Sequence, residues 1–345
     1  MADAATAVIA SDLLLDVKNL CKYFPVKKGF FGKLQGVARA VDGVSLHIRR
    51  GETLGLVGES GCGKTTLGRC VIRALDPTSG EILYNSKRFG PTDLASARGE
   101  ALHAMRREMH MVFQDPYSSL DPRMTVLDIV GEPLRCNGIA SGEALTDRVK
   151  EVIQTVGLEV KHLRRYPHAF SGGQRQRVGI ARSLAANPDL VICDEAVSAL
   201  DVSIQAQILN LLQVLQEQFN LTYLFVSHDL AVIRHVSDRV AVMYAGNLVE
   251  MADTDALYTD PRHPYTEALL SAVPKTTRHG RSKRIILAGE VANPMAPPPG
   301  CRFHPRCRYA RAVCSQEVPA WRGIGEGHAV ACHFADELEL SAIPG

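Results

Sequence analysis

The residues with the clearest chemistry lie in the stretch Gly58-Glu59-Ser60-Gly61-Cys62-Gly63-Lys64-Thr65-Thr66. It fits the phosphate-loop pattern G-x-x-x-x-G-K-[ST] at every fixed position. Glycines let backbone N–H groups converge on an anion, and a helix start adds its positive end. Lys64 would reach the outer phosphates, and Thr65 would hold Mg²⁺. A chance glycine-rich turn is the alternative, but the coincidence of all fixed positions predicts a bound nucleotide. The expected contacts are Gly58, Ser60, Gly61, Cys62, Gly63, Lys64, Thr65 and Thr66.

A pair of carboxylates follows the apolar run 190–193. In a phosphate-loop protein, Asp194 fits a Mg²⁺ ligand and Glu195 fits the group that orients or deprotonates the attacking water. An acidic strand end without a role is the common alternative. Because phosphoryl transfer needs both a metal and a positioned water, we expect the catalytic role here.

A second anion-binding helix start is indicated by Ser171-Gly172-Gly173-Gln174, which stands just before a predicted helix. Ser171 would supply the capping hydroxyl. One helix start already belongs to the loop of Lys64. A second one suggests a nucleotide that is held by a partner subunit.

These motifs together resemble the nucleotide-binding subunits of ATP-binding-cassette (ABC) transporters, whose signature reads Ser171-Gly172-Gly173-Gln174-Arg175-Gln176-Arg177 here. The resemblance implies that ATP is the nucleotide. It further implies four roles: stacking on adenine, contact with Mg²⁺ and water, a loop across a dimer interface, and contact with the γ-phosphate. The residues at these positions are Phe24 (with Tyr23 as the fallback), Gln114, Ser198-Ala199-Leu200-Asp201 and His228. Taken alone, Gln114 and His228 are ordinary polar residues at strand ends.

One position departs from the family pattern. The family commonly has proline after the catalytic glutamate, whereas this chain has Ala196. Since Glu195 is retained, the resemblance still implies activity, with a turn that holds the glutamate less rigidly and with slower hydrolysis.

The tail narrows the resemblance. Four of its stretches resemble the carboxy-terminal extension of oligopeptide and dipeptide importer ATPases: His263-Pro264-Tyr265-Thr266, Gly289-Glu290, Pro297-Pro298-Pro299-Gly300-Cys301 and Arg306-Cys307. The loop from Tyr23 to Gly29 suggests the second of the two paired ATPases of such importers.

Four of the nine cysteines cluster in this tail, with five, six and seventeen residues between them: Cys301, Cys307, Cys314 and Cys332. Clustered thiols in a region of little apolar mass suggest a ligand that replaces a core. Zinc and a [4Fe–4S] cluster would both accept four thiolates. Zinc sites more often have C-x2-C pairs, which are absent here, and the family resemblance favours iron–sulfur. Ordinary thiols remain the third possibility.

The pattern of apolar runs predicts an α/β fold. Alternating apolar and polar residues predict a half-buried strand at Val37–Ile48. Unbroken apolar runs predict parallel strands that are covered on both faces. Arg239–Met251 is predicted to form a hairpin that turns at residues 245–247. Residues 86–108 are charged and irregular, and 25–36 are expected to form a loop. The resemblance implies a domain over 1–255, with a RecA-like α/β core, an antiparallel β subdomain and a helical subdomain at about 115–175, and an extension over 256–345.

Composition adds exclusions. The 345 residues are 46% hydrophobic with a net charge of +2, so charge favours neither nucleic acid nor a membrane surface. No apolar run approaches the ~18 residues that a bilayer span needs, and the amino terminus lacks the features of an export signal. We expect a cytoplasmic protein. The basic run from Lys275 to Arg311 is interpreted as a solvated linker, with anionic headgroups as the alternative ligand.

The resemblance implies an importer motor on the cytoplasmic face of the membrane. Two ATPase subunits, identical or paralogous, would sandwich two ATP molecules and drive two transmembrane permease subunits, with an extracytoplasmic binding protein as an indirect partner. Peptides are the default cargo, and relatives with nickel, haem or sugar cargo keep this open. The alternative is a soluble cassette ATPase that acts on DNA or the ribosome. The absence of a heptad run and the presence of one cassette per chain argue against it, so no nucleic-acid partner is expected.

Overall fold

The computed structural model of the protein describes residues 10–28, 33–115, 119–273 and 284–341. The chain divides into two compact units. The first unit comprises the residues up to Leu15 together with Ile48–Glu52 and Leu83–Val226. The second unit comprises Asp16–His47, Thr53–Ile82 and the residues from Ser227 onward.

A buried β-sheet forms the centre of the second unit. Its strands, in spatial order, are β11 (Arg322–Gly325), β12 (His328–Val330), β10 (Asn247–Asp253), β9 (Arg239–Tyr244) and β3 (Thr53–Val57). β3 runs parallel to β9, with Val57 opposite Val242. Every side chain of these two strands is buried, as their nearly unbroken apolar sequences predict. β9 and β10 form the hairpin that was predicted to turn at residues 245–247.

Two long strands of the second unit lie outside this sheet. β2 (Lys33–Arg49) lies beside β1 (Leu13–Lys28), and β1 lies beside β4 (Ser79–Ser86). The expected loop over 25–36 is therefore shorter, because β1 continues to Lys28 and β2 begins at Lys33. Residues 29–32 of that expected loop lie outside the described residues.

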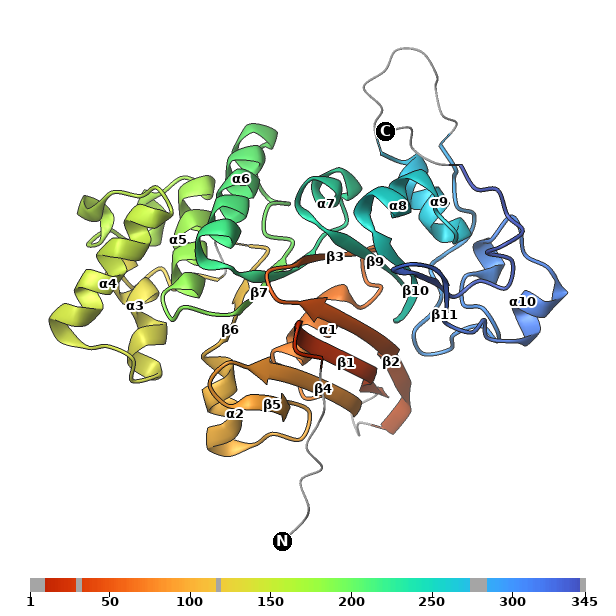
Figure 1. The fold of residues 1–345 in the computed structure, drawn as a ribbon, viewed down its shortest axis with the longest axis horizontal. Helices are drawn as coiled ribbons and strands as arrows, with labels where there is room; N and C mark the ends of the chain where they lie inside the picture. Colours follow the sequence, from red (N-terminus) through yellow and green to blue (C-terminus); the bar gives the residue numbers. More distant parts are fainter. Residues whose placement is uncertain (1–9, 29–32, 116–118, 274–283, 342–345) are drawn as a thin grey trace, which may run out of the picture. The chain divides into compact units, whose positions relative to one another are not determined.

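The first unit contains three parallel strands in the order β8-β7-β6: β8 (Thr222–Val226), β7 (Leu190–Asp194) and β6 (Met109–Val112). Leu190 pairs with Thr222 on one side and with Met109 on the other. The helix α6 (Val202–Phe219) connects β7 to β8, and its apolar residues Ile208, Leu212 and Leu215 are buried. Three further helices pack together in this unit (Figure 1): α3 (Val126–Cys136), α4 (Gly142–Thr155) and α5 (Gly172–Leu184).

One segment of the first unit differs from its prediction. Residues 86–108 were expected to be irregular, yet they contain β5 (Gly90–Asp93) and α2 (Gly99–Arg106). β5 pairs antiparallel with β4, with Leu83 opposite Asp93. Gly and Pro are poor strand formers, so the sequence Gly90-Pro91 does not predict a strand. The strand is stabilised by its pairing with β4.

The carboxy-terminal part of the second unit is organised around the sheet edge. Its short helices are α8 (Thr254–Thr259), α9 (Pro264–Ser271), η3 (His304–Arg306) and α10 (Ala312–Gln316). The fully buried carboxylate of Glu250 on β10 accepts hydrogen bonds from the backbone N–H groups of Arg262 (2.6 Å) and His263 (3.0 Å). It also lies 2.8 Å from Nε2 of His328 on β12. This carboxylate therefore ties two segments of the extension, 262–263 and the strand of His328, to β10.

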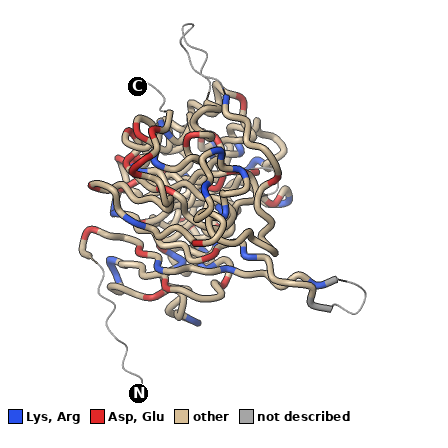
Figure 2. Tube along the Cα trace, turned by 90° about the vertical axis from the view of Figure 1, so that its right-hand side faces the viewer, with Lys and Arg blue, Asp and Glu red and all other residues tan. Residues whose placement is uncertain are grey.

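The basic run from Lys275 to Arg311 is a solvated linker only in part. Residues 284–300 form no helix or strand, and Arg284 is exposed. The later arginines instead form ion pairs with carboxylates of the same unit: Arg302 with Asp42, Arg306 with Glu59, Arg308 with Glu267 and Arg311 with Glu337. Lys275, Arg278, Arg281 and Lys283 lie outside the described residues. Figure 2 shows Lys and Arg interspersed with Asp and Glu along the chain, in line with the net charge of +2.

No described helix is both long and apolar enough to cross a bilayer.

Candidate nucleotide-binding and catalytic site

The phosphate loop has a shape that only glycine permits at its two ends. Gly58 and Gly63 adopt φ values of +155° and +110°. A Cβ on Gly58 would lie 2.1 Å from the carbonyl oxygen of Met243, and one on Gly63 would lie 2.1 Å from that of Ala40. The loop backbone is thus pressed against two neighbouring segments of the second unit, and this contact fixes its curvature.

The helix α1 (Lys64–Val71) starts directly from this loop. Its N-cap is Gly63, which has no side chain to cap the helix, so the first turn keeps its N–H groups directed toward the loop. Lys64 is buried, and its Nζ donates to the carbonyl oxygens of Gly58 (2.8 Å) and Glu59 (3.0 Å). A glycine cradle, a helix start and an ammonium group in one loop fit the phosphates of a nucleotide.

The two aromatic candidates for adenine stacking differ in their surroundings. The Tyr23 hydroxyl donates to the carboxylate of Asp42, and this hydrogen bond is the main reason that the pKa of Tyr23 is raised. The Phe24 ring is 36% exposed, with Nζ of Lys22 at 5.0 Å from its centroid. A ring that is exposed can stack on a base, so this arrangement favours Phe24 over Tyr23.

His228 lies in the second unit, two residues after the end of β8. The backbone N–H of Ser227 donates to the carbonyl oxygen of Leu56 on β3 at 3.1 Å. This bond places His228 near the end of the strand that leads into the phosphate loop. His228 is exposed, and the helix α7 (Leu230–Val236) starts two residues later.

In the first unit, the structure brings Gln114 and Glu195 together. Nε2 of Gln114 donates to Oε2 of Glu195 at 2.6 Å. Asp194, the last residue of β7, is buried, whereas Glu195 is partly exposed. An amide and a carboxylate that touch at a strand end can together orient a water molecule, which is the chemistry that the sequence predicted for Glu195.

Glu195 has an unusual backbone. Its φ is +48°, a left-handed value that residues other than glycine rarely adopt. Its N–H donates to the carbonyl oxygen of Val226 at 2.9 Å, and its carbonyl accepts from the N–H of Ser198 at 3.1 Å. These two bonds hold the turn. Ala196, where the family commonly has proline, is buried, at 1% exposed.

The signature stretch forms a reciprocal cap at the start of α5. Oγ of Ser171 accepts from the N–H of Gln174 (3.3 Å), and Oε1 of Gln174 accepts from the N–H of Ser171 (3.0 Å). A Cβ on Gly173 would lie 2.5 Å from Cγ2 of Ile204 on α6, so glycine is required for the two helices to approach. Asp201 is exposed and is the N-cap residue of α6.

The four clustered cysteines do line one small cavity of about 20 Å³, but the prediction of a [4Fe–4S] cluster is wrong. No group of three or more His, Cys, Asp or Glu side chains that could hold a metal ion occurs among the described residues. Burial raises the pKa of Cys307 and of Cys332 to about 11, and it raises the pKa of Cys301 as well. Burial therefore favours the neutral thiol form of these side chains. Together with Cys314, these side chains form part of the packing of the extension.

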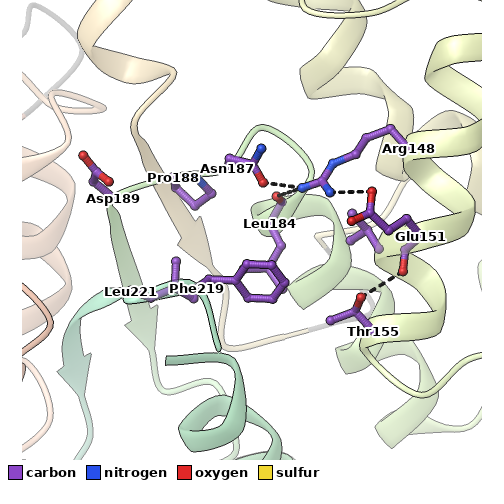
Figure 3. A pocket seen from close by; sticks show the side chains of 10 residues that line it. Arg148, Glu151, Thr155, Leu184, Asn187, Pro188, Asp189, Phe219 and Leu221 are labelled. Carbon is purple, nitrogen blue, oxygen red and sulfur yellow. Dashed lines mark hydrogen bonds and ion pairs between the residues drawn. The ribbon is translucent and has the colours of Figure 1, made fainter. Parts of the chain in front are cut away.

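A larger cavity of about 400 Å³ in the first unit is a separate feature (Figure 3). Arg148 on α4 is one of its lining residues and donates to Glu151 at 2.8 Å, as Figure 3 shows. It also donates to the carbonyl oxygen of Ala185 at 3.2 Å. Its lining includes Asp189, just before β7 begins, whereas Asp194 ends that strand. The cavity therefore lies at the opposite end of β7 from the carboxylates, and it is lined by none of the predicted site residues.

Sequence reasoning missed the residues that surround Glu59. This glutamate occupies a variable position of the phosphate loop, yet its carboxylate pairs with Arg306 and its N–H donates to Tyr265. Two signals were present in the sequence. One is an acidic residue in a loop that binds phosphate, and the other is the basic run 275–311, whose only acidic residue is Glu290.

A phosphate loop on a parallel strand, a carboxylate pair at a strand end and a capped signature helix define a nucleotide-binding α/β cassette. Known proteins bear this out. Residues 41–198 match the family described as ABC transporter, and residues 249–314 match the oligopeptide/dipeptide transporter C-terminal region. The chain belongs to the ATP-binding proteins of ABC transporters, in the group that carries this C-terminal region. It is an ATPase whose activity is coupled to transport, and the resemblance seen in the sequence is confirmed.

Relatives match over nearly the whole chain. The oligopeptide transport ATP-binding protein AppF of Bacillus subtilis is 49% identical over 94% of this chain and 98% of its own length. The dipeptide transport ATP-binding protein DppF of Escherichia coli is 47% identical over 94% of this chain and 96% of its own length. A similar solved structure is the dimeric post-hydrolysis state of the ATP-binding cassette MJ0796 bound to ADP and Pi. It is 30% identical, covers 70% of this chain and 98% of its own, and has a TM-score of 0.60.

Proposed function

We propose that this chain binds MgATP in the loop Gly58–Thr66 and hydrolyses it to drive the import of dipeptides or oligopeptides. The observation that carries the proposal is the glycine cradle, in which Gly58 and Gly63 each leave no room for a Cβ beside a backbone carbonyl. The peptide cargo is supported by the match of residues 249–314 and by the names of the relatives.

Each predicted residue has a role in this proposal. Lys64 neutralises the outer phosphates, and Thr65, Gln114 and Asp194 hold Mg²⁺ or its water. Glu195 takes the proton of the attacking water, with Gln114 orienting its carboxylate. Phe24 stacks on adenine, and His228 contacts the γ-phosphate.

The signature completes the site of a second ATPase subunit. Ser171, Gly172, Gly173, Gln174 and Asp201 would face the nucleotide of that subunit. The dimeric form of the cassette MJ0796 supports this arrangement. The remaining partners are two transmembrane permeases and, indirectly, an extracytoplasmic binding protein, and the site of action is the cytoplasmic face of the membrane. The cassette spans 1–255, with its helical subdomain at about 115–175, and the extension spans 256–345.

Reconstitution tests the proposal. The chain is assembled with its permeases and partner ATPase in proteoliposomes, and phosphate release is followed with a peptide-loaded binding protein. We expect hydrolysis that the loaded binding protein stimulates and that Lys64→Ala removes. Hydrolysis that responds to nucleic acid or ribosomes, and not to the binding protein, would contradict the transport role.

A further inference from the structure

Glu59, the first variable residue of the phosphate loop, has three anchors. Its backbone N–H donates to the hydroxyl oxygen of Tyr265 at 2.8 Å. Its carboxylate accepts from Nη1 and Nη2 of Arg306 at 2.6 and 3.1 Å. Its carbonyl oxygen accepts from Nζ of Lys64 at 3.0 Å. Two of the three anchors come from the carboxy-terminal extension, and the third is the lysine that would reach the phosphates.

The pair of Arg306 and Glu59 is half-buried. The Arg306 side chain is only 7% exposed, and that of Glu59 is 28% exposed. The hydrogen bond to Glu59 is the main reason that the pKa of Arg306 is raised. A bidentate, charge-assisted contact of this kind fixes both distance and orientation. Removing one partner would leave the other charge in a poorly solvated place, so the carboxylate of Glu59 would move.

The groups that hold Glu59 are themselves fixed by aromatic packing. Tyr244, Tyr265 and Phe303 are almost fully buried, and their ring centroids lie 4.7 to 5.3 Å apart. The guanidinium of Arg306 lies 5.9 Å from the centroid of Tyr244. Tyr244 directly follows Met243, whose carbonyl lies against Gly58. The extension therefore contacts the loop through a buried, packed aromatic cluster.

We propose that Arg306 and Tyr265 are positioning residues for the phosphate loop, so that the affinity for ATP depends on the carboxy-terminal extension. The proposal rests on the proposed function in that the loop binds ATP. Neither side chain needs to touch the nucleotide. They fix the backbone position of Gly58 and Glu59. The carbonyl oxygens of these two residues accept the hydrogen bonds of Lys64, so their position sets the geometry of the phosphate loop.

The alternative is that Arg306 only fastens the extension to the cassette. In that case its loss would lower the unfolding temperature without changing the affinity for nucleotide. The two roles separate in ADP binding to the purified full-length chain, measured by titration calorimetry, alongside KM and kcat for ATP in the assembled transporter.

For Arg306→Ala we expect ADP affinity to fall by about 5- to 10-fold and KM for ATP to rise in step, with kcat within about twofold of wild type. Arg306→Lys, which keeps the charge but loses the fork, should recover only part of the affinity. The double variant Glu59→Ala/Arg306→Ala should be no weaker than the worse single variant, because both remove one contact. Tyr265→Phe keeps the ring and removes only the hydroxyl, so it provides a milder test should Arg306→Ala fold poorly.

The matched control is Arg311→Ala. Arg311 lies in the same extension and pairs with Glu337 at 2.9 Å, but both side chains are more than half exposed and neither contacts the loop. It should bind ADP as wild type does. Wild-type ADP affinity in Arg306→Ala and Tyr265→Phe, or additive effects of Glu59→Ala and Arg306→Ala, would overturn the proposal. If the wild-type chain bound no ADP, the proposed function itself would fail.

Discussion

The two helix starts that sequence reasoning assigned to phosphate binding are built in opposite ways. At the start of α1, Gly63 has a left-handed backbone and no side chain, and Lys64 adds a positive charge. At the start of α5, Ser171 and Gln174 cap each other's N–H groups. One start is left without a side-chain cap, and the other satisfies its own donors.

This difference suggests that one helix start binds the nucleotide first and that the other contacts it only later. A helix start without a side-chain cap gains most from an external anion, since its first N–H groups have no intrahelical acceptor. A capped start gains less, because an incoming phosphate must compete with the cap. We infer that α1 recruits the nucleotide and that α5 contributes only when a partner subunit presents one already bound.

The largest expected effect is on ATP hydrolysis, with nucleotide binding unchanged. Glu195→Gln keeps the shape of the side chain beside Gln114 but removes the base. We expect kcat for ATP to fall by at least about 100-fold, with ADP affinity unchanged. Single-turnover phosphate release in the assembled transporter measures the first quantity, and calorimetry measures the second. Glu217→Gln, an exposed position on α6, is the control. Retained hydrolysis would remove Glu195 from its role.

Gly63→Ala tests the cradle of α1. The alanine Cβ would meet the carbonyl oxygen of Ala40 at 2.1 Å from a φ of +110°. Such strain costs about 1–3 kcal/mol, so we expect ADP affinity to fall by about 30-fold. Gly61→Ala is the matched control, because Gly61 also has a left-handed φ of +80° but has nothing within 4 Å of the added Cβ. Equal losses in both variants would show that backbone strain alone, and not the close approach, shapes the loop.

The sequence predicted the parts of the site that local pattern determines. Gly58, Lys64, Asp194 and Ser171 each belong to a short motif whose residues are neighbours in the chain, so spacing alone identified them. The contact of Glu59 with Arg306 joins residues 247 positions apart, and no local pattern encodes it. The cysteines illustrate the same limit. Their clustering was visible in the sequence, but their arrangement in space was not, and among the described residues no group of three or more His, Cys, Asp or Glu side chains could hold a metal ion.

The next prediction concerns stability in acid and the buried His263, the N-cap residue of α9. His263 is 1% exposed, and burial lowers its pKa from 6.5 to about 3. Below pH 6.5, His263 binds a proton in the unfolded chain but not in the folded chain. The contribution of neutral His263 to the free energy of unfolding is therefore complete above pH 6.5 and is lost as the pH falls toward 3. At pH 5.5 the loss is about 1.4 kcal/mol.

Urea unfolding at pH of about 7.5 and about 5.5, one unit on either side of the usual pKa of histidine, measures this effect. His263→Asn keeps an acceptor for the N–H of Tyr265, which His263 now binds through Nδ1 at 3.0 Å, but it cannot titrate. We expect it to lose less stability in acid than wild type. Burial also lowers the pKa of His110 in the first unit, to about 4, and that contribution is common to both proteins. An unchanged acid sensitivity in His263→Asn would rule out His263 as its source.

The smallest expected effect concerns the cap of α5. Ser171→Ala removes an N-cap hydroxyl and should cost about 1 kcal/mol of stability. Thr125→Ala is the matched variant, because Thr125 caps α3 in the same unit by accepting from the N–H of Asp128 at 3.2 Å. Both should unfold at similar urea concentrations and bind ADP as wild type does. If α5 contacts the partner's nucleotide, only Ser171→Ala should slow ATP hydrolysis in the assembled transporter. Equal hydrolysis in the two variants would reduce Ser171 to a helix cap, since the loss of a cap alone affects both helices alike.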